Sequence, residues 1–443
     1  MNKLILYIFL VILFNCNETP ARSEIAIINV NIIPMDSERI LESQTLIIEH
    51  GIITKIGSSA TVKIPKNAQI INGKNRYLIP GLMDMHVHIE ESDLPLFLAN
   101  GITTVRNLNG DKTHLKLRRK VDQGEIAGPR IYTSGPLICG KNTKWKIKAV
   151  PKSQKEVKEI VKTQKKLGYD FIKVYDGLTS DIYQALMEEA KEQNIKVVGH
   201  IPKSVGLKGV LNAGQASIEH IEKIVKDYFG IQYNLQNIMK VAKMIKSSGT
   251  FVCPTLALQE NFYLNSQGKF LKKLKNPEMN YVDSEIMSWW KSITIENNGD
   301  VSKSKSTSNE DLGFYNFQLK LTKSLFDMKI PLIAGTDTPN LGMVPGFSIH
   351  EELRNMVAAG LSPYHALETA TRNAAAFLGI ENETGIIKEG MIADLVLLKK
   401  NPLINISNTK SQVGIIVRGK WYSKNKIQAS INKIFKESLS KAD

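Results

Sequence analysis

The sequence has few cysteines and no hydrophobic run long enough to cross a bilayer comfortably. With three cysteines in 443 residues, a disulfide framework is excluded, and Cys139 and Cys253 are expected to be buried thiols. The lysines behind the formal net charge of +15 are scattered along the chain, without zinc-finger spacing or an RNA-binding signature. We therefore expect a solvated basic surface and no nucleic-acid partner. The hydrophobic fraction of 42% fits a globular enzyme.

An apolar run lies near the N-terminus, where Lys3 precedes residues 4–14 and a polar stretch follows. This order predicts a signal peptide over residues 1–22, with a buried first strand as the alternative. Cys16 stands where a bacterial lipoprotein carries its lipid, although only Leu13 of the three preceding residues fits a lipobox. The hypotheses are export to the periplasm and attachment to the membrane by a lipid on Cys16.

Two strand-rich flanks enclose a middle of different character. Residues 23–77 and 380–430 consist of short apolar stretches broken by turn residues, which predicts one small composite β-sandwich built from both chain ends. In the middle, residues 78–379, strand-like segments alternate with helical stretches such as 153–167 and 180–193. Eight such segments lie at residues 77–88, 101–106, 130–134, 170–175, 195–200, 216–220, 250–255 and 330–337. Eight parallel βα units predict a (β/α)8 TIM barrel whose active site lies at the C-terminal strand ends.

One connection departs from this alternation of strands and helices. Residues 256–312 are rich in Lys, Asn and Ser, with scattered aromatic side chains such as Phe262 and Trp289. Long connections at the catalytic face are often lids or specificity loops. The alternative is a surface helix pair that does not contact substrate.

Four of the eight histidines fall at predicted strand ends. His86 and His88 are two residues apart, so strand alternation points both imidazoles toward the barrel mouth. The other candidate ligands at strand ends are His200, His220 and Asp337. Imidazoles and a carboxylate on one rim suit Zn²⁺ or a neighbouring transition metal.

Lys173 ends the fourth strand, and Tyr175 follows on the same face. A protonated amine cannot ligate a cation. A lysine that loses its proton can react with CO₂ to give a carbamate, whose two oxygens can bridge two ions. The alternative is a structural or substrate-binding lysine. Tyr175 is either a hydrogen-bond donor to a developing oxyanion or a core tyrosine.

Several motifs together resemble the amidohydrolase superfamily. The first-strand motif is residues 78–88 (LIPGLMDMHVH), and in the family order follow residues 101–106 (GITTVR), 171–175 (FIKVY), 199–202 (GHIP), 217–220 (SIEH), 334–338 (AGTDT), 366–375 (ALETATRNAA) and 390–395 (GMIADL). The resemblance covers residues 25–422 and is strongest to the imidazolonepropionase-like branch with its Xaa-Pro dipeptidases (prolidases). Relatives often have Asp at the position of Asn107, which leaves the hydrogen bonding around the ligands open.

The resemblance implies a binuclear centre, with Zn as the expected metal. His86, His88 and Asp337 would hold the more buried ion, His200 and His220 the more exposed one, and carboxylated Lys173 would bridge the two. A metal-bound hydroxide would attack the scissile carbonyl and the C–N bond would break, with Asp337 as general base and then as general acid. His350 would reach substrate from the loop after the last strand. The alternative is that His350 lies at the start of a helix.

Three functions remain open from the sequence. The first is hydrolysis of amide or peptide-like C–N bonds in a small molecule, such as a dipeptide or an N-acyl amino acid. The second is a deaminase or lactonase that uses the same metal site, which Lys173 disfavours. The third is a non-catalytic, surface-anchored binding protein, which the complete ligand set disfavours. An oligomer is compatible with all three.

Overall fold

The computed structural model describes residues 24–230, 233–298 and 308–439. The predicted signal peptide and Cys16 therefore lie outside the described residues. Among the described helices, none combines the length and the apolar character needed to cross a membrane.

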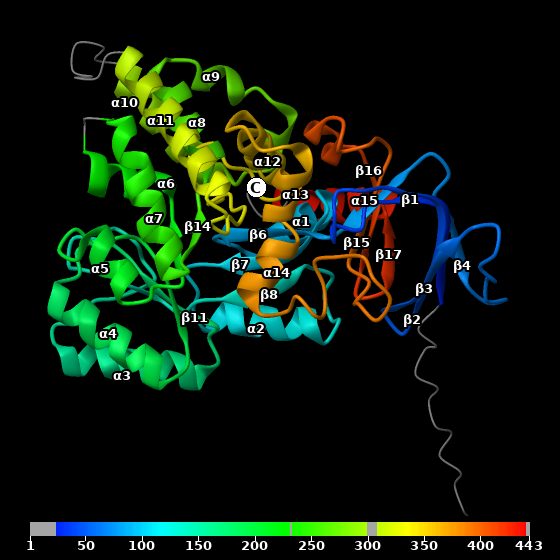
Figure 1. Ribbon diagram of the computed structural model, residues 1–443, viewed down its shortest axis with the longest axis horizontal. Coiled ribbons are helices and arrows are strands. Elements are labelled where there is room, and N and C mark those ends of the chain that lie inside the picture. Colours follow the sequence, from blue (N-terminus) through cyan, green and yellow to red (C-terminus); the bar gives the residue numbers. More distant parts are fainter. Residues whose placement is uncertain (1–23, 231–232, 299–307, 440–443) are drawn as a thin grey trace, which may run out of the picture.

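Strands from both ends of the chain form one eight-stranded sheet, which lies at one side of the molecule (Figure 1). In the order β17-β16-β15-β5-β1-β2-β3, with β4 also paired to β1, the strands are β17 (Lys420–Ser423), β16 (Gln412–Val417), β15 (Leu395–Leu398), β5 (Tyr77–Pro80), β1 (Ile25–Ile32), β2 (Leu41–Glu49), β3 (Ile52–Ser58) and β4 (Gln69–Asn72). Strand β15 is buried on both faces. Leu395 and Leu397 pack in the core of this sheet, and Val396 and Leu398 pack in the main core of the molecule. The alternating faces of β15 thus join the sheet to the rest of the protein.

Seven parallel strands of the middle of the chain correspond to predicted ones. They are β6 (Leu82–Val87), β7 (Ile102–Asn107), β8 (Arg130–Thr133), β11 (Phe171–Val174), β12 (Lys196–Gly199), β13 (Ser217–Glu219) and β14 (Phe251–Cys253). Strands β6-β7-β8 form one sheet and β11-β12-β13-β14 belong to another, which also holds β9 (Leu137–Ile138) and β10 (Lys148–Ala149). A bridge between Ser134 and Phe171 links the two sheets.

The eighth predicted strand, residues 330–337, is not a regular strand. It is held by isolated bridges from Leu332 to Val252 of β14 and from Thr338 to Val87 of β6. Pro331 lacks an amide hydrogen and Asp337 has a φ of 60°, so a regular ladder cannot form here. Even so, the segment lies between β14 and β6, and every parallel segment has a neighbour on both sides.

Helices follow most of these strands and pack around them (Figure 1). They are α1 (Leu94–Ala99), α2 (Lys112–Asp122), α3 (Gln154–Leu167), α4 (Ser180–Glu192), α5 (Gly206–Asn212), α6 (Ile221–Ile224), α7 (Ile238–Ser248), α11 (Ser308–Asp327), α12 (Ile349–Ala358), α13 (Pro363–Thr369), α14 (Arg372–Leu378) and α15 (Lys424–Leu439). The bounds of α3 agree with local signals: the Ser153 side chain caps its first turn, and Gly168, with a φ of 89°, ends it.

The connection after β14 folds into α8 (Leu256–Ser266), α9 (Phe270–Lys273) and α10 (Ser284–Asn298). Trp290 is fully buried in a small apolar core of this region, and its indole N–H donates to the Pro339 carbonyl over 3.3 Å. Because Pro339 follows the eighth parallel segment, this contact fastens the connection to the strand ends.

Candidate metal centre and active site

All six predicted ligands line one cavity of about 140 Å³, together with Tyr175. His86 comes from β6, Lys173 from β11 and His200 directly follows β12. His220 follows β13, and Asp337 lies on the eighth segment. The parallel strands end at the same rim, so residues far apart in sequence meet there. His88 is one residue past the end of β6 and completes the set.

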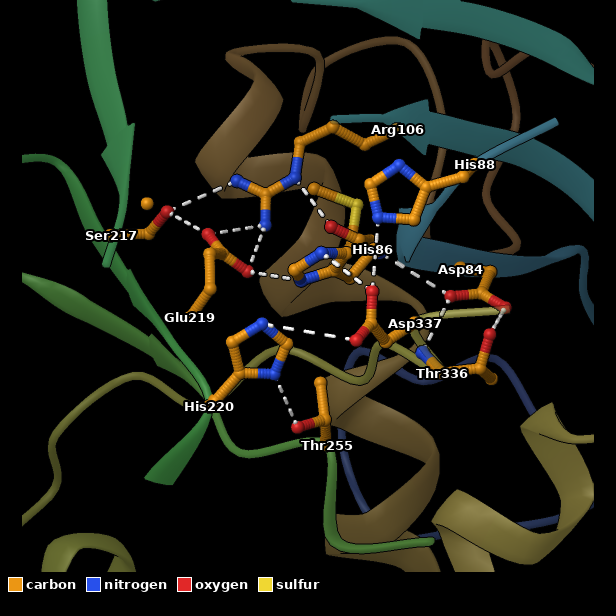
Figure 2. A network of polar contacts seen from close by, with 12 residues as sticks. Asp84, His86, His88, Arg106, Ser217, Glu219, His220, Thr255, Thr336 and Asp337 are labelled. Carbon is orange, nitrogen blue, oxygen red and sulfur yellow. Dashed lines mark hydrogen bonds and ion pairs between the residues drawn. The ribbon is translucent and has the colours of Figure 1, made fainter. Parts of the chain in front are cut away.

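Asp337 lies at the centre of this group (Figure 2). Its Oδ1 is 3.1 Å from His86 Nε2 and 3.0 Å from His88 Nε2, and its Oδ2 is 3.9 Å from His220 Nε2. Asn340 donates to Oδ2 over 2.9 Å. Three imidazole nitrogens and a carboxylate thus converge on one point.

Three of the histidines are oriented by an oxygen at Nδ1. Glu219 lies 3.1 Å from Nδ1 of His86, Asp176 lies 3.1 Å from that of His200, and the Thr255 hydroxyl lies 2.9 Å from that of His220. The carboxylates of Glu219 and Asp176 only accept, which favours the proton on Nδ1 of His86 and His200 and leaves Nε2 as the atom that would ligate a cation. This is the arrangement in which metal-binding histidines are commonly held.

The pair of Glu219 and Arg106 extends the contacts of His86 into the interior (Figure 2). Both side chains are fully buried, and Arg106 donates to the two oxygens of Glu219 over 2.8 and 2.9 Å. Ser217 donates to Glu219 over 2.5 Å. Burial alone would raise the pKa of Glu219, but Arg106 and His86 outweigh it and hold that pKa well below its usual range. Glu219 therefore stays ionised as the acceptor for His86.

Burial favours the neutral form of three imidazoles and of the lysine amine. It lowers the pKa of His88 and His220, and that of His200 to about 4. It also lowers the pKa of Lys173 from 10.5 to about 8, although Glu219 and Asp337 act in the opposite direction. An imidazole or amine without its proton offers a lone pair to a cation or to CO₂.

The carboxylate of Asp337 behaves differently. Burial alone would raise its pKa, but the nearby imidazoles of His86 and His220 hold it well below the usual range. The site therefore combines an ionised carboxylate with neutral imidazoles at His88, His200 and His220.

The backbone is unusual at the positions that present these groups. His220, Thr255 and Asp337 have φ values of 68°, 52° and 60°, in the left-handed region that few non-glycine residues adopt. Such conformations persist where the surrounding structure compels them, and they concentrate at functional sites. At His220, the turn places two consecutive side chains, Glu219 and His220, on the same side, next to His86 (Figure 2).

The residues present fit a metal ion. The ligand atoms of His86, His220 and Asp337 lie within 4.8 Å of one another, and all three residues are buried. Nδ1 of His88 and Nζ of Lys173 are buried polar atoms without a hydrogen-bond partner in the described part of the chain. Unpaired buried polar atoms are costly, so their presence beside this group points to a missing partner. His86, Glu219 and Cys253 also form a group of possible ligands, but Arg106 already supplies the positive charge there.

His350 is not at the site. It lies in the first turn of α12, fully buried, with its Nδ1 2.9 Å from the Thr409 hydroxyl, and it is not among the residues that line the cavity. The structure thus agrees with a helix position and not with contact to substrate.

We expect His350 to make the folded protein sensitive to acid. Burial lowers its pKa from 6.5 to about 3, so the unfolded chain binds the proton more tightly than the folded one. The free energy of unfolding should fall by up to about 1.4 kcal/mol per pH unit between about pH 6 and pH 4 because of this group. Urea unfolding of the wild type and of His350→Asn at pH 7 and pH 5 tests this expectation. The difference in free energy of unfolding between the two proteins should be smaller at pH 5 than at pH 7. An equal difference at both pH values would contradict it.

Other residues of the site were not predicted from the sequence. Glu219, Arg106 and Thr255 orient the ligands, but strand alternation places Glu219 on the face opposite His220. Asn107 is fully buried. Its side-chain amide accepts a hydrogen bond from the Ile89 backbone N–H and donates one to the Thr133 hydroxyl, so both ends of the amide are hydrogen-bonded. Cys139 and Cys253 are buried and free, as expected.

The chain is similar to known proteins over most of its length. The family described as "Amidohydrolase family" matches residues 77–422. Ochratoxinase from Aspergillus niger is 24% identical, covering 85% of this chain and 81% of that protein. A 5'-deoxyadenosine deaminase from Methanococcus maripaludis is 23% identical, covering 82% of this chain and 84% of that protein. The crystal structure of a Xaa-Pro dipeptidase with bound methionine superimposes with a TM-score of 0.68 at 21% identity, covering 90% of this chain and all of that one.

Proposed function

Because the chain belongs to the amidohydrolase family, we propose that it is a metal-dependent hydrolase of a C–N bond in a small substrate. The observation that carries the proposal is the set of six potential ligands around one cavity, in which Lys173 Nζ and His88 Nδ1 are buried without a partner. The proposed substrates are dipeptides or N-acyl amino acids.

We propose the finer architecture as well. The eight parallel segments, each paired on both sides, are interpreted as a (β/α)8 barrel over residues 78–379. The eight-stranded sheet is interpreted as part of the predicted composite β-sandwich of residues 23–77 and 380–430. The support for this division is that the two regions have separate apolar cores, joined through β5, β15 and β16.

Two divalent ions, with Zn²⁺ as the first candidate, are proposed to occupy the centre. His86, His88 and Asp337 would hold one, His200 and His220 the other, and carboxylated Lys173 would bridge them. Carboxylation joins the neutral Lys173 amine to CO₂ and releases one proton. The lowered pKa of Lys173, about 8, favours the required neutral amine. Imidazole, carboxylate and carbamate are ligands that zinc accepts.

When bound, divalent ions would lower the pKa of a water toward neutrality and polarise the scissile carbonyl. Asp337 would accept the proton of the attacking water at a carboxylate oxygen and then donate it to the leaving nitrogen. Its low pKa keeps it ionised before the reaction. Tyr175 lies beside His200, with ring centroids 4.2 Å apart, and burial raises its pKa, so its phenol keeps the proton that could stabilise an oxyanion.

A deaminase is the second candidate, because 5'-deoxyadenosine deaminases are among the relatives. The two functions differ in the need for Lys173: a bridging lysine fits two ions, and deaminases of this fold usually use one ion and lack that lysine. A lactonase would use the same centre as the hydrolase. A binding protein without activity would not need the unpaired Lys173.

The proposal is tested by metal removal and a substrate screen. Protein stripped with a chelator should lose its activity and regain it with Zn²⁺. The screen compares dipeptides, N-acyl amino acids, lactones and aminopurines, with metal content measured in the same samples. Hydrolysis of an amide that depends on about two ions per chain supports the hydrolase. Ammonia release from an aminopurine with one ion would favour the deaminase.

We also propose export, with a lipid on Cys16. Its support is the order of Lys3, an apolar run and a polar stretch in the sequence. Labelling with a fatty-acid analogue should mark the wild type and not Cys16→Ser; an unlabelled wild type would exclude lipidation.

A further inference from the structure

Two aromatic side chains stand at the mouth of the cavity and are incompletely buried. Trp145, in the loop between β9 and β10, is 36% exposed, and Phe262, on α8, is 44% exposed. Both line the cavity that holds the six potential ligands. Large exposed aromatic side chains beside a concave site are typical of binding surfaces.

Trp145 is fixed by contacts with residues of the proposed reaction. Its ring lies 5.0 Å from that of His88 and 6.5 Å from that of Tyr175, measured between centroids. The ring therefore lies beside His88 and Tyr175 and also lines the cavity.

The rest of the wall is largely apolar or uncharged, apart from the ion-paired Glu222 and Lys223. Leu108, Leu137 and Leu258 line the cavity, and Gln259 and Asn340 add uncharged amides. Lys223 also lines it, but its Nζ lies 3.1 Å from Asp176 and 3.6 Å from Glu222. Its charge is thus matched by these carboxylates, and the mouth favours an uncharged group.

We propose that Trp145 and Phe262 form an aromatic specificity site that binds a flat, apolar group attached next to the scissile C–N bond. This inference rests on the proposed function, because it names the substrate class of the same cavity. Aromatic rings bury large apolar areas and stack at offset or tilted angles. The cavity of about 140 Å³ must also hold the proposed ions and the reacting bond, so the apolar group would lie at its mouth, beside the two exposed aromatic side chains.

The test compares two substrates that differ only in the group at this site: N-acetyl-L-phenylalanine and N-acetyl-L-alanine. The wild type should prefer the phenylalanine substrate in kcat/KM by about tenfold or more, the size of effect expected for a modest apolar difference. Trp145→Ala and Phe262→Ala should each reduce this ratio by about tenfold. Trp289→Ala is the matched control. Trp289 lies on α10, in the same connection as Phe262, and is 45% exposed, but it does not line the cavity. The ratio of the two kcat/KM values should therefore be unchanged in this variant. Unaltered ratios in both Trp145→Ala and Phe262→Ala would overturn the proposal.

A binding measurement separates this inference from the proposed function. The metal-loaded protein is titrated with L-phenylalanine and with L-alanine while tryptophan emission is recorded. Phenylalanine should change the emission of the wild type at lower concentration than alanine, and the change should be lost in Trp145→Phe, which keeps the other tryptophans. If neither N-acyl substrate is hydrolysed but this difference is seen, the aromatic site stands and the proposed reaction fails. An equal response to both amino acids, or a response unchanged by Trp145→Phe, would overturn the site.

Discussion

Lys173→Ala should lose most of its bound metal and at least about a hundredfold in activity, because changes in residues that merely orient metal ligands already cost 10–100-fold. Lys173 is 2% exposed, and its Nζ is buried without a hydrogen-bond partner among the described residues. A carbamate at this position would satisfy that atom and add two oxygen ligands. Metal content per chain and kcat/KM are the measurements.

Added short carboxylates distinguish a bridge from a purely structural lysine. Formate or acetate should restore part of the metal content and activity of Lys173→Ala, because either can occupy the space of the carbamate. Lys223→Ala is the matched control: this lysine lines the same cavity but is paired with Asp176, so its variant should keep its metal and not respond to carboxylate. Wild-type metal content in Lys173→Ala would exclude the carbamate bridge.

Asp337→Asn should lower kcat by about 10²–10⁴-fold, the range attributed to a general acid–base group. The amide has nearly the same shape, so the fold should be retained, and its oxygen can still ligate metal weakly. Thermal unfolding and metal content, measured beside kcat, separate loss of the proton acceptor from loss of structure.

Asp176→Asn provides the comparison for this change. Asp176 is a second carboxylate beside the site, 3.1 Å from Nδ1 of His200, but it is not proposed to move a proton during the reaction. Its variant should affect metal affinity more than kcat in metal-saturated protein. A fully active Asp337→Asn would contradict the role proposed for Asp337.

The sequence alone determined where the parallel strands end and which side chains appear there. Alternation of side chains along a strand was enough to place His86 with His88 and Lys173 with Tyr175 on shared faces. Helix α3 was predicted almost to the residue, since its serine cap and closing glycine are local signals. These features depend on short-range geometry, which is determined by residues close together in the sequence.

The tertiary structure decided what lies beside the ligands. Alternation places Glu219 and His220 on opposite faces, but the left-handed backbone of His220 brings both toward His86. Trp145 lies in a loop, whose path no sequence periodicity predicts. His350 contacts the Thr409 hydroxyl and does not line the cavity. These positions are set by contacts between segments far apart in the chain, and such contacts leave no local pattern in the sequence.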